Sequence, residues 1–322
     1  MPSVEANGIR IAYETFGRAD DPTLLLIAGN GAQLTFWEPD FCELLAEAGF
    51  RVICFDNRDA GLSTKFDEAG TPDIMAVAAA VGAGREVASP YSLDDMADDA
   101  AGLLDALSIE QAHVCGASMG GMIAQIVACR HPGRVLSLTS IMSSTGNPAL
   151  PQGRPEAIAA VTGPAPEERD ACIEHNLAVW RAIWSPGFPF EEERARAFLA
   201  TSYDRSWCPQ GMARQSVAVI LSGDRRRALS SIRVPTLVIH GSADPLIPVE
   251  AGEDTARTIS CAELLVVAGM GHDMPTPAWG RMANAIVGNA RRAFAGSRGQ
   301  TSPGPAGNRP AVRRAGPESA AH

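Results

Sequence analysis

Long apolar runs and an excess of positive charge are both absent from this sequence of 322 residues. No apolar run approaches about 18 residues, the length of a candidate membrane-spanning helix, so we expect no membrane partner. Asp and Glu together number 37 against 27 for Lys and Arg, which gives a net charge of −10. This acidity argues against a nucleic-acid partner, because phosphates require a basic face on the protein. The N-terminus also lacks the basic start and apolar stretch of a signal peptide.

Cysteines at motif spacing are absent as well. The seven cysteines are an odd number, and no two of them form a Cys-x-x-Cys pair. This pattern predicts free thiols rather than a disulfide framework, and it offers no zinc spacing. We therefore expect a cytoplasmic protein without a metal site. Lysine is scarce too, since Lys65 is the single one, and we interpret this as a bias of composition rather than as chemistry.

Short apolar runs alternate with helical patterns along much of the chain. Residues 24–27 read Leu-Leu-Leu-Ile, a continuous run typical of a strand buried on both faces. After Ser92, apolar residues recur at the helical period, and Asp95 occupies the capping-box position. This alternation predicts the α/β class, with a mostly parallel sheet flanked by helices. The expected strands cover residues 9–16, which should be antiparallel, and 23–28, 51–55, 112–115, 135–142, 236–239 and 264–267.

Residues 147–228 interrupt the alternation. They contain no strong strand pattern, show helical patterns at 172–184 and 191–203, and include the tryptophans Trp180, Trp184 and Trp207. We interpret this aromatic-rich insertion as a helical cap over a pocket, and the alternative is an extra helical layer packed on the sheet. The predicted organisation is an α/β core of residues 1–146 and 229–296, a cap of residues 147–228, and a disordered tail of residues 297–322. The tail is rich in Gly, Pro, Ser, Ala and Arg and cannot bury enough apolar surface to fold.

The strongest motif is Gly-Ala-Ser-Met-Gly-Gly at residues 116–121, directly after an expected strand and before an expected helix. This is G-x-S-x-G in a strand–turn–helix context, which places Ser118 on a sharp turn as a nucleophile. Side chains at Gly116 or Gly120 would collide with neighbouring segments of such a turn. The helix N-terminus beside the serine favours developing negative charge.

A serine nucleophile needs a base, and the base needs an acid that orients it. His272 follows the last expected strand in a Gly-Met-Gly-His loop and is the candidate base. Asp244 lies in the loop after the strand at 236–239 and is the candidate acid. His240 ends that strand, and we expect it to pack or to form local hydrogen bonds. Asp273 adjoins the histidine, and we expect it to be a surface or loop residue.

The oxyanion formed by serine attack requires two N–H donors. One should be the backbone N–H of Met119, directly after the nucleophile. The other should come from the Gly-Asn-Gly loop at residues 29–31, where we favour the backbone of Asn30. The alternative is that these glycines only form a tight turn.

Taken together, these residues resemble the α/β-hydrolase fold family over residues 5–293. The elbow at Ser118, followed by Asp244 and then His272, matches the family's pattern. Residues 56–63 also resemble a turn that recurs in this family, which we interpret as structural. Within the family the sequence is similar to bacterial lipase- and esterase-like members, including the aclacinomycin methylesterase type and macrolide-lactone esterases. It departs from the usual His-Gly of the oxyanion loop, where Ala28-Gly29 stands instead.

The resemblance implies hydrolysis of a small-molecule carboxylic ester or lactone through an acyl-enzyme, with no metal or organic cofactor. The aromatic insertion suggests a bulky apolar substrate, such as a macrolide or polyketide ester. One alternative is a thioesterase, peptidase, C–C hydrolase or perhydrolase with the same three residues, and another is a non-catalytic ligand-binding protein on the same scaffold. Haloalkane dehalogenases and epoxide hydrolases use an Asp nucleophile, so Ser118 disfavours them. No sequence signal sets the oligomeric state.

Overall fold

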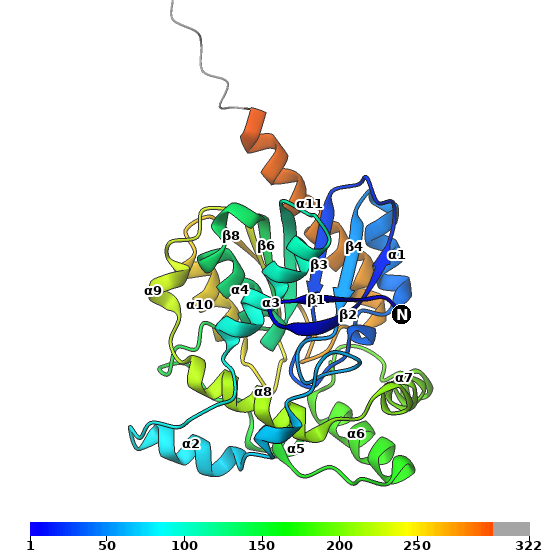
Figure 1. Cartoon of the computed structure of the whole chain (residues 1–322), viewed down its shortest axis with the longest axis vertical. Helices are drawn as coiled ribbons and strands as arrows, with labels where there is room; N and C mark the ends of the chain where they lie inside the picture. The colour runs from blue at the N-terminus through cyan, green and yellow to red at the C-terminus, as the bar shows by residue number, and fades with distance from the viewer. Residues whose placement is uncertain (299–322) are drawn as a thin grey trace, which may run out of the picture.

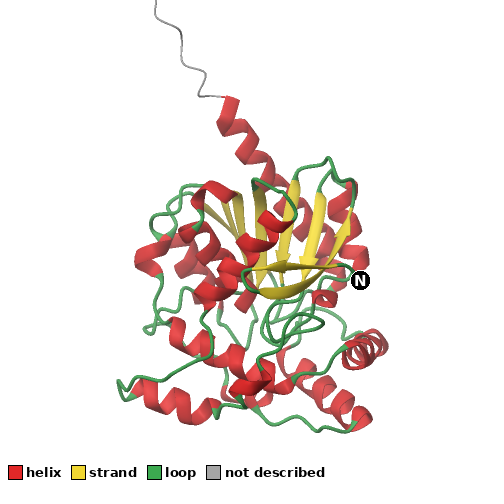
Figure 2. Ribbon diagram, viewed as in Figure 1, coloured by secondary structure: helices red, strands yellow, loops and turns green. Residues whose placement is uncertain are grey.

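A computed structural model describes residues 1–298 of the chain. Its centre is a sheet with helices packed on both sides (Figure 2). The eight strands of the sheet have the order β1-β2-β4-β3-β5-β6-β7-β8. All seven predicted strands are present, with ends shifted by no more than two residues, and β1 is an additional short strand. The strands are β1 (Ser3–Ala6), β2 (Ile9–Phe16), β3 (Thr23–Ile27), β4 (Arg51–Phe55), β5 (Ala112–Ala117), β6 (Val135–Ile141), β7 (Thr236–Gly241) and β8 (Ala262–Val267).

The pairing of the strands is mostly parallel. β2 pairs antiparallel with both β1 and β4, as predicted for residues 9–16, and every other pair is parallel. All five residues of β3 are buried, because the strand has a neighbour on each side and helices on both faces. Parallel pairing brings the carboxyl ends of β5, β7 and β8 to one edge of the sheet, where the loops after them carry the candidate residues.

Helices cover both faces of the sheet, and successive residues of β3 point to opposite faces. Leu25 and Ile27 belong to the apolar cluster that includes α3 and α4, whereas Leu24 and Leu26 belong to the cluster that includes α1 and α11. The helices are α1 (Pro39–Glu47), α2 (Ile74–Gly82), α3 (Leu93–Ala106), α4 (Met119–Arg130), α5 (Pro155–Thr162), α6 (Arg169–Ile183), α7 (Glu192–Arg205), α8 (Pro209–Ser222), α9 (Arg226–Leu229), α10 (Val249–Thr258) and α11 (Trp279–Arg298).

The predicted capping box at the start of α3 is confirmed. The Ser92 hydroxyl accepts a hydrogen bond from the Asp95 backbone N–H at 3.2 Å, and the Asp95 carboxylate accepts one from the Ser92 N–H at 2.8 Å. Two N–H groups that the helix itself leaves unpaired therefore have partners.

Five helices, α5 to α9, lie between β6 and β7, and we call the first four, α5 to α8, the inserted helices. Figure 1 shows the inserted helices beyond one end of the sheet, while the C-terminal part of α11 projects beyond the opposite end. The two predicted helical segments correspond to α6 and α7 with ends shifted by one to three residues, and α5 and α8 are additional. Helix α11 continues through Arg298, so the first two residues of the predicted tail are helical. The rest of that prediction, residues 299–322, lies outside the described residues.

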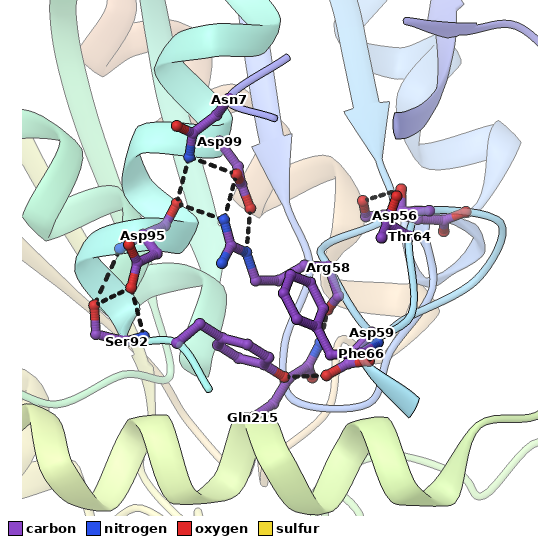
Figure 3. A network of polar contacts seen from close by, with 12 residues as sticks. Asn7, Asp56, Arg58, Asp59, Thr64, Phe66, Ser92, Asp95, Asp99 and Gln215 are labelled. Atoms are coloured by element: carbon purple, nitrogen blue, oxygen red, sulfur yellow. Dashed lines mark hydrogen bonds and ion pairs between the residues drawn. The ribbon is translucent and has the colours of Figure 1, made fainter. Parts of the chain in front are cut away.

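The turn after β4, residues 56–63, forms hydrogen bonds with other segments of the core, which agrees with our interpretation of the turn as structural (Figure 3). The Asp56 carboxylate is buried and accepts hydrogen bonds from the backbone N–H groups of Leu34 and Leu62 at 2.7 and 2.8 Å. The Arg58 guanidinium forms two bonds to the buried Asp99 carboxylate, at 2.6 and 2.7 Å. The single lysine, Lys65, also stabilises this turn, because its ammonium donates to three backbone carbonyls of the turn. The scarcity of lysine in the sequence did not suggest this contact.

Candidate active site

Ser118 lies on a sharp turn between β5 and α4. Its backbone has φ of 56° and ψ of −121°, a left-handed conformation that is rare for a residue with a side chain. A Cβ atom on Gly116 would lie 2.0 Å from the Gly120 carbonyl oxygen, and one on Gly120 would lie 2.1 Å from the Ile27 carbonyl oxygen. Both contacts are with backbone that cannot move aside, so these two positions require glycine, as the motif predicts.

Three loops bring Ser118, Asp244 and His272 into a chain of contacts. The His272 Nε2 atom lies 3.0 Å from the Ser118 hydroxyl, and the Nδ1 atom of the same ring lies 2.8 Å from an oxygen of Asp244. The Asp244 and His272 side chains are almost completely buried. The structure thus places the three predicted residues at the distances that proton transfer from serine to histidine requires.

Backbone donors fix the Asp244 carboxylate. Its Oδ1 atom accepts hydrogen bonds from the N–H groups of Leu246 and Ile247, both at 2.9 Å, which leaves Oδ2 for His272. His240 lies near the same carboxylate, at 3.6 Å, and its Nε2 atom contacts the Ile247 carbonyl oxygen at 2.8 Å. Burial lowers the pKa of His240, so this ring stays neutral and structural, as expected.

The loop after β3 lies directly against the nucleophile. A Cβ atom on Gly29 would be 3.8 Å from the Ser118 hydroxyl oxygen, and the next residue is Asn30. Two bonds to α8 fix this loop, one from the Gly31 N–H to the Gln215 side chain and one from the Asn30 side chain to Ser216, both at 2.7 Å. Within residues 1–298 the backbone N–H groups of Asn30 and Met119 have no protein acceptor, which leaves both available to a ligand.

A cavity of about 340 Å³ opens above the serine, between the edge of the sheet and the inserted helices. Ser118 and His272 lie on its wall. The predicted tryptophans Trp180, Trp184 and Trp207 all line it, together with Phe198 and Tyr203 of α7. A site of this kind suits a substrate with a large apolar group.

Asp273 was expected to be a surface or loop residue, and it does lie in the loop after β8, but on the cavity wall rather than on the outer surface. It lines the cavity, and its Oδ1 atom accepts a hydrogen bond from the Ser185 hydroxyl at 2.6 Å. Its Oδ2 atom is buried and has no hydrogen-bond partner among the described residues. Burial raises the pKa of Asp273 to about 6, an effect that hydrogen bonds from Ser185 oppose.

Arginines of the inserted helices reach the core and were not identified from the sequence. Arg194 of α7 contacts Glu38 at 2.7 and 3.0 Å and donates to Thr276 at 2.9 Å on the cavity rim. Arg214 of α8 forms two bonds of 2.8 Å to the buried carboxylate of Asp59. Charged residues in helical patterns are common on solvated faces, so nothing in the sequence distinguishes these arginines from exposed ones.

Side chains that could hold a metal ion do not cluster anywhere in residues 1–298. In the same part of the chain no helix is both long enough and apolar enough to cross a membrane.

Comparison with known proteins identifies relatives over most of the chain. Residues 22–275 match the family model described as the alpha/beta hydrolase fold. The chain is 29% identical to rhodomycin D methylesterase DauP of a Streptomyces species, over 91% of this chain and 99% of the relative. It is also 29% identical to 3-oxoadipate enol-lactonase 2 of Acinetobacter baylyi, over 78% of this chain and 82% of the relative.

Solved structures share the same architecture. A meta-cleavage product hydrolase of Pseudomonas fluorescens superposes with a TM-score of 0.70 at 21% identity, covering 91% of this chain and 98% of the other. This likeness concerns the fold, since the sequences have diverged widely.

Proposed function

Since the chain belongs to the α/β-hydrolase fold family, we propose that it is a serine hydrolase that cleaves a carboxylic ester or lactone. The observation that carries the proposal is the chain of contacts from Ser118 to His272 at 3.0 Å and from His272 to Asp244 at 2.8 Å, on the wall of a cavity. The methylesterase and the enol-lactonase among the relatives support the same class of reaction.

In the proposed mechanism the serine forms an acyl-enzyme. The Asp244 carboxylate accepts a hydrogen bond from the Nδ1–H group of His272, so Nε2 carries a lone pair toward the Ser118 hydroxyl. His272 removes the hydroxyl proton while Ser118 Oγ attacks the ester carbonyl carbon, and Asp244 stabilises the resulting imidazolium. The backbone N–H groups of Asn30 and Met119 donate to the oxyanion.

Collapse of the tetrahedral intermediate breaks the bond to the alcohol, and His272 gives its proton to the leaving oxygen. A water molecule then attacks the acyl carbon, His272 takes a proton from that water, and Ser118 Oγ leaves with the proton from the histidine. The products are an acid and an alcohol, or one hydroxy acid from a lactone, and the enzyme returns to its starting state.

We propose a bulky apolar substrate, because aromatic side chains line the cavity and its volume is about 340 Å³. A methyl ester of a large acid and a lactone are the leading candidates, since relatives are named for these two groups. A macrolide or other polyketide ester remains the more specific prediction. A cytoplasmic location is proposed on the seven unpaired cysteines.

The test is hydrolysis of p-nitrophenyl esters of increasing acyl length by the wild type and by Ser118→Ala. We expect turnover by the wild type and its loss in the variant, since only the nucleophile is removed. Methyl esters and macrolides follow, with products identified by mass spectrometry. Parallel assays of thioesters, peptides and C–C substrates distinguish other reactions of the same three residues.

A fluorophosphonate label tests the non-catalytic alternative. We expect it to attach at Ser118 of the wild type and not to Ser118→Ala. A folded wild type that neither hydrolyses any substrate class nor takes the label would overturn the proposed function in favour of a ligand-binding protein.

A further inference from the structure

The loop that carries His272 is bonded to the inserted helices as well as to the sheet. The His272 backbone N–H donates to the Ile183 carbonyl at the end of α6, at 2.8 Å. Four residues past the end of α6, the Gly187 N–H donates to the Gly269 carbonyl, also at 2.8 Å. These two bonds join segments more than 80 residues apart in the sequence, so the end of α6 lies directly against the loop.

Ser185 adds a side-chain bridge at the centre of this contact. Its side chain is buried, its hydroxyl oxygen accepts a hydrogen bond from the Gly271 N–H at 2.7 Å, and its hydroxyl hydrogen goes to Asp273 Oδ1 at 2.6 Å. Gly271 and Asp273 are the two neighbours of His272 in the chain. One hydroxyl group therefore contacts the backbone before the histidine and the side chain after it.

The contact leaves no space between the two segments. A Cβ atom on Gly271 would lie 2.5 Å from the Trp184 carbonyl oxygen, and one on Gly187 would lie 2.6 Å from the Gly269 Cα atom. The glycines permit this approach, but they also make the loop flexible, because glycine restricts the backbone least. External bonds must then supply the rigidity that the loop sequence does not.

We propose that Ser185, acting through Gly271 and Asp273, is a positioning residue for His272. The Asp244 contact fixes one end of the imidazole ring, but the ring also depends on where the loop backbone lies. Bonds to Ser185 on both sides of His272 define that backbone position and hold Nε2 at 3.0 Å from Ser118. The segment after α6 thus positions the base, while the inserted helices also form part of the cavity wall.

This inference rests on the proposed function, and Ser185→Ala is its direct test. A displacement of about 1 Å in a reacting group costs on the order of a hundred-fold in rate. We expect kcat on a p-nitrophenyl ester to fall by about ten- to a hundred-fold, with KM nearly unchanged, because Ser185 does not line the cavity. The rate of fluorophosphonate labelling at Ser118 should fall in parallel, since it reports proton removal by His272 without a full turnover.

Ser137→Ala is the matched control. Ser137 is also a buried serine, and its hydroxyl contacts His113 at 2.8 Å on β6, away from the cavity. We expect it to lose a comparable amount of thermal stability but to keep the wild-type kcat and labelling rate. If Ser185→Ala loses no more kcat than Ser137→Ala, the positioning role is wrong while the esterase activity of the wild type still supports the proposed function.

A pair of variants at Asp273 keeps the inference testable if Ser185→Ala does not fold. Asp273→Asn retains an oxygen that can accept from the Ser185 hydroxyl, whereas Asp273→Ala removes the acceptor. We expect kcat of the Ala variant to be about ten-fold or more below that of the Asn variant, because only the Asn side chain can still accept from the Ser185 hydroxyl. Equal kcat values for the two variants would overturn the inference.

Discussion

At the scale of the residue, the elbow depends on glycines that have backbone on all sides. Gly116→Ala would bring a methyl group within about 2.0 Å of the Gly120 carbonyl oxygen. We expect this variant to lose esterase activity and to unfold at lower temperature, because neither strand nor helix can move away. The measurement is the thermal midpoint beside kcat/KM for a p-nitrophenyl ester.

Gly133→Ala is the matched glycine substitution. A Cβ atom there would meet nothing within 4 Å, so the change should leave activity intact and stability equal or slightly higher. Equal behaviour of the two alanine variants would show that the elbow has more freedom than these contacts allow.

Also at the scale of the residue, buried His113 makes stability depend on pH. Burial lowers its pKa to about 4, because the ring lies among apolar groups with one contact to Ser137. The unfolded chain binds a proton near pH 6.5 and the folded chain only near pH 4, so this contribution is complete above pH 6.5 and is lost as the pH falls toward 4.

The loss attributable to His113 should be on the order of 2–3 kcal/mol in the free energy of unfolding. Urea unfolding of the wild type and His113→Gln at pH 7 and pH 4.5 measures it. We expect the wild type to lose more stability between the two pH values than the variant. A variant that loses as much as the wild type would assign the acid sensitivity to other groups.

Single residues differ in how far the sequence reveals them. Ser118, Asp244 and His272 were predicted as site residues because each follows an expected strand in a recognisable loop. Asp273 and Ser185 were not, because their contact joins residues 88 apart and exists only once α6 packs on the loop. A pattern read along the chain contains no information on such packing.

At the scale of the element, buried strands were the easiest part to predict. Continuous apolar runs such as β3 mark strands covered on both faces, and all seven expected strands are present. The strand that was missed, β1, has four residues and only one of them is buried, so it carries no apolar signal. Helix α2 is the opposite case, because its sequence is strongly apolar and would predict burial, yet none of its residues is buried.

A buried ion pair between α8 and the turn after β4 leads to a prediction about the stability of the fold. Arg214 forms two bonds of 2.8 Å with Asp59, and both side chains are buried. Arg214→Met would leave the carboxylate buried without its counter-ion, and we expect the free energy of unfolding to fall by about 3–5 kcal/mol. Urea unfolding provides the measurement.

The exposed pair of Arg226 with Asp224 is the control for this effect, since its side chains are 42% and 34% exposed. Arg226→Met should cost less than about 1 kcal/mol, because water screens the pair. A cost for Arg214→Met as small as that of the control would mean that Asp59 finds other partners.

At the scale of the whole molecule, the sheet and the inserted helices together form the candidate site. The sheet edge supplies Ser118 and His272, and the inserted helices supply aromatic walls and the contact of α6 with the histidine loop. The sequence predicts that an aromatic insertion lies between two strands. It does not predict which faces of α6 and α7 meet the sheet, because their apolar and charged residues have no single clear stripe.

Cavity size therefore depends on residues of the inserted helices, and Trp180 is the one to test. Its ring lies on the cavity wall and contacts Trp184 and Phe198, with ring centroids 6.5 and 5.0 Å away. Trp180→Leu should enlarge the cavity, so we expect the acyl length at which kcat/KM begins to fall to move to longer chains. Turnover of the acetate ester should change least, because its acyl group is the shortest of the series. Phe190→Leu is the control, since Phe190 packs against Trp184 at 4.8 Å without lining the cavity. If both variants keep the wild-type length preference, the acyl group lies elsewhere and the aromatic wall contacts the alcohol half of the substrate.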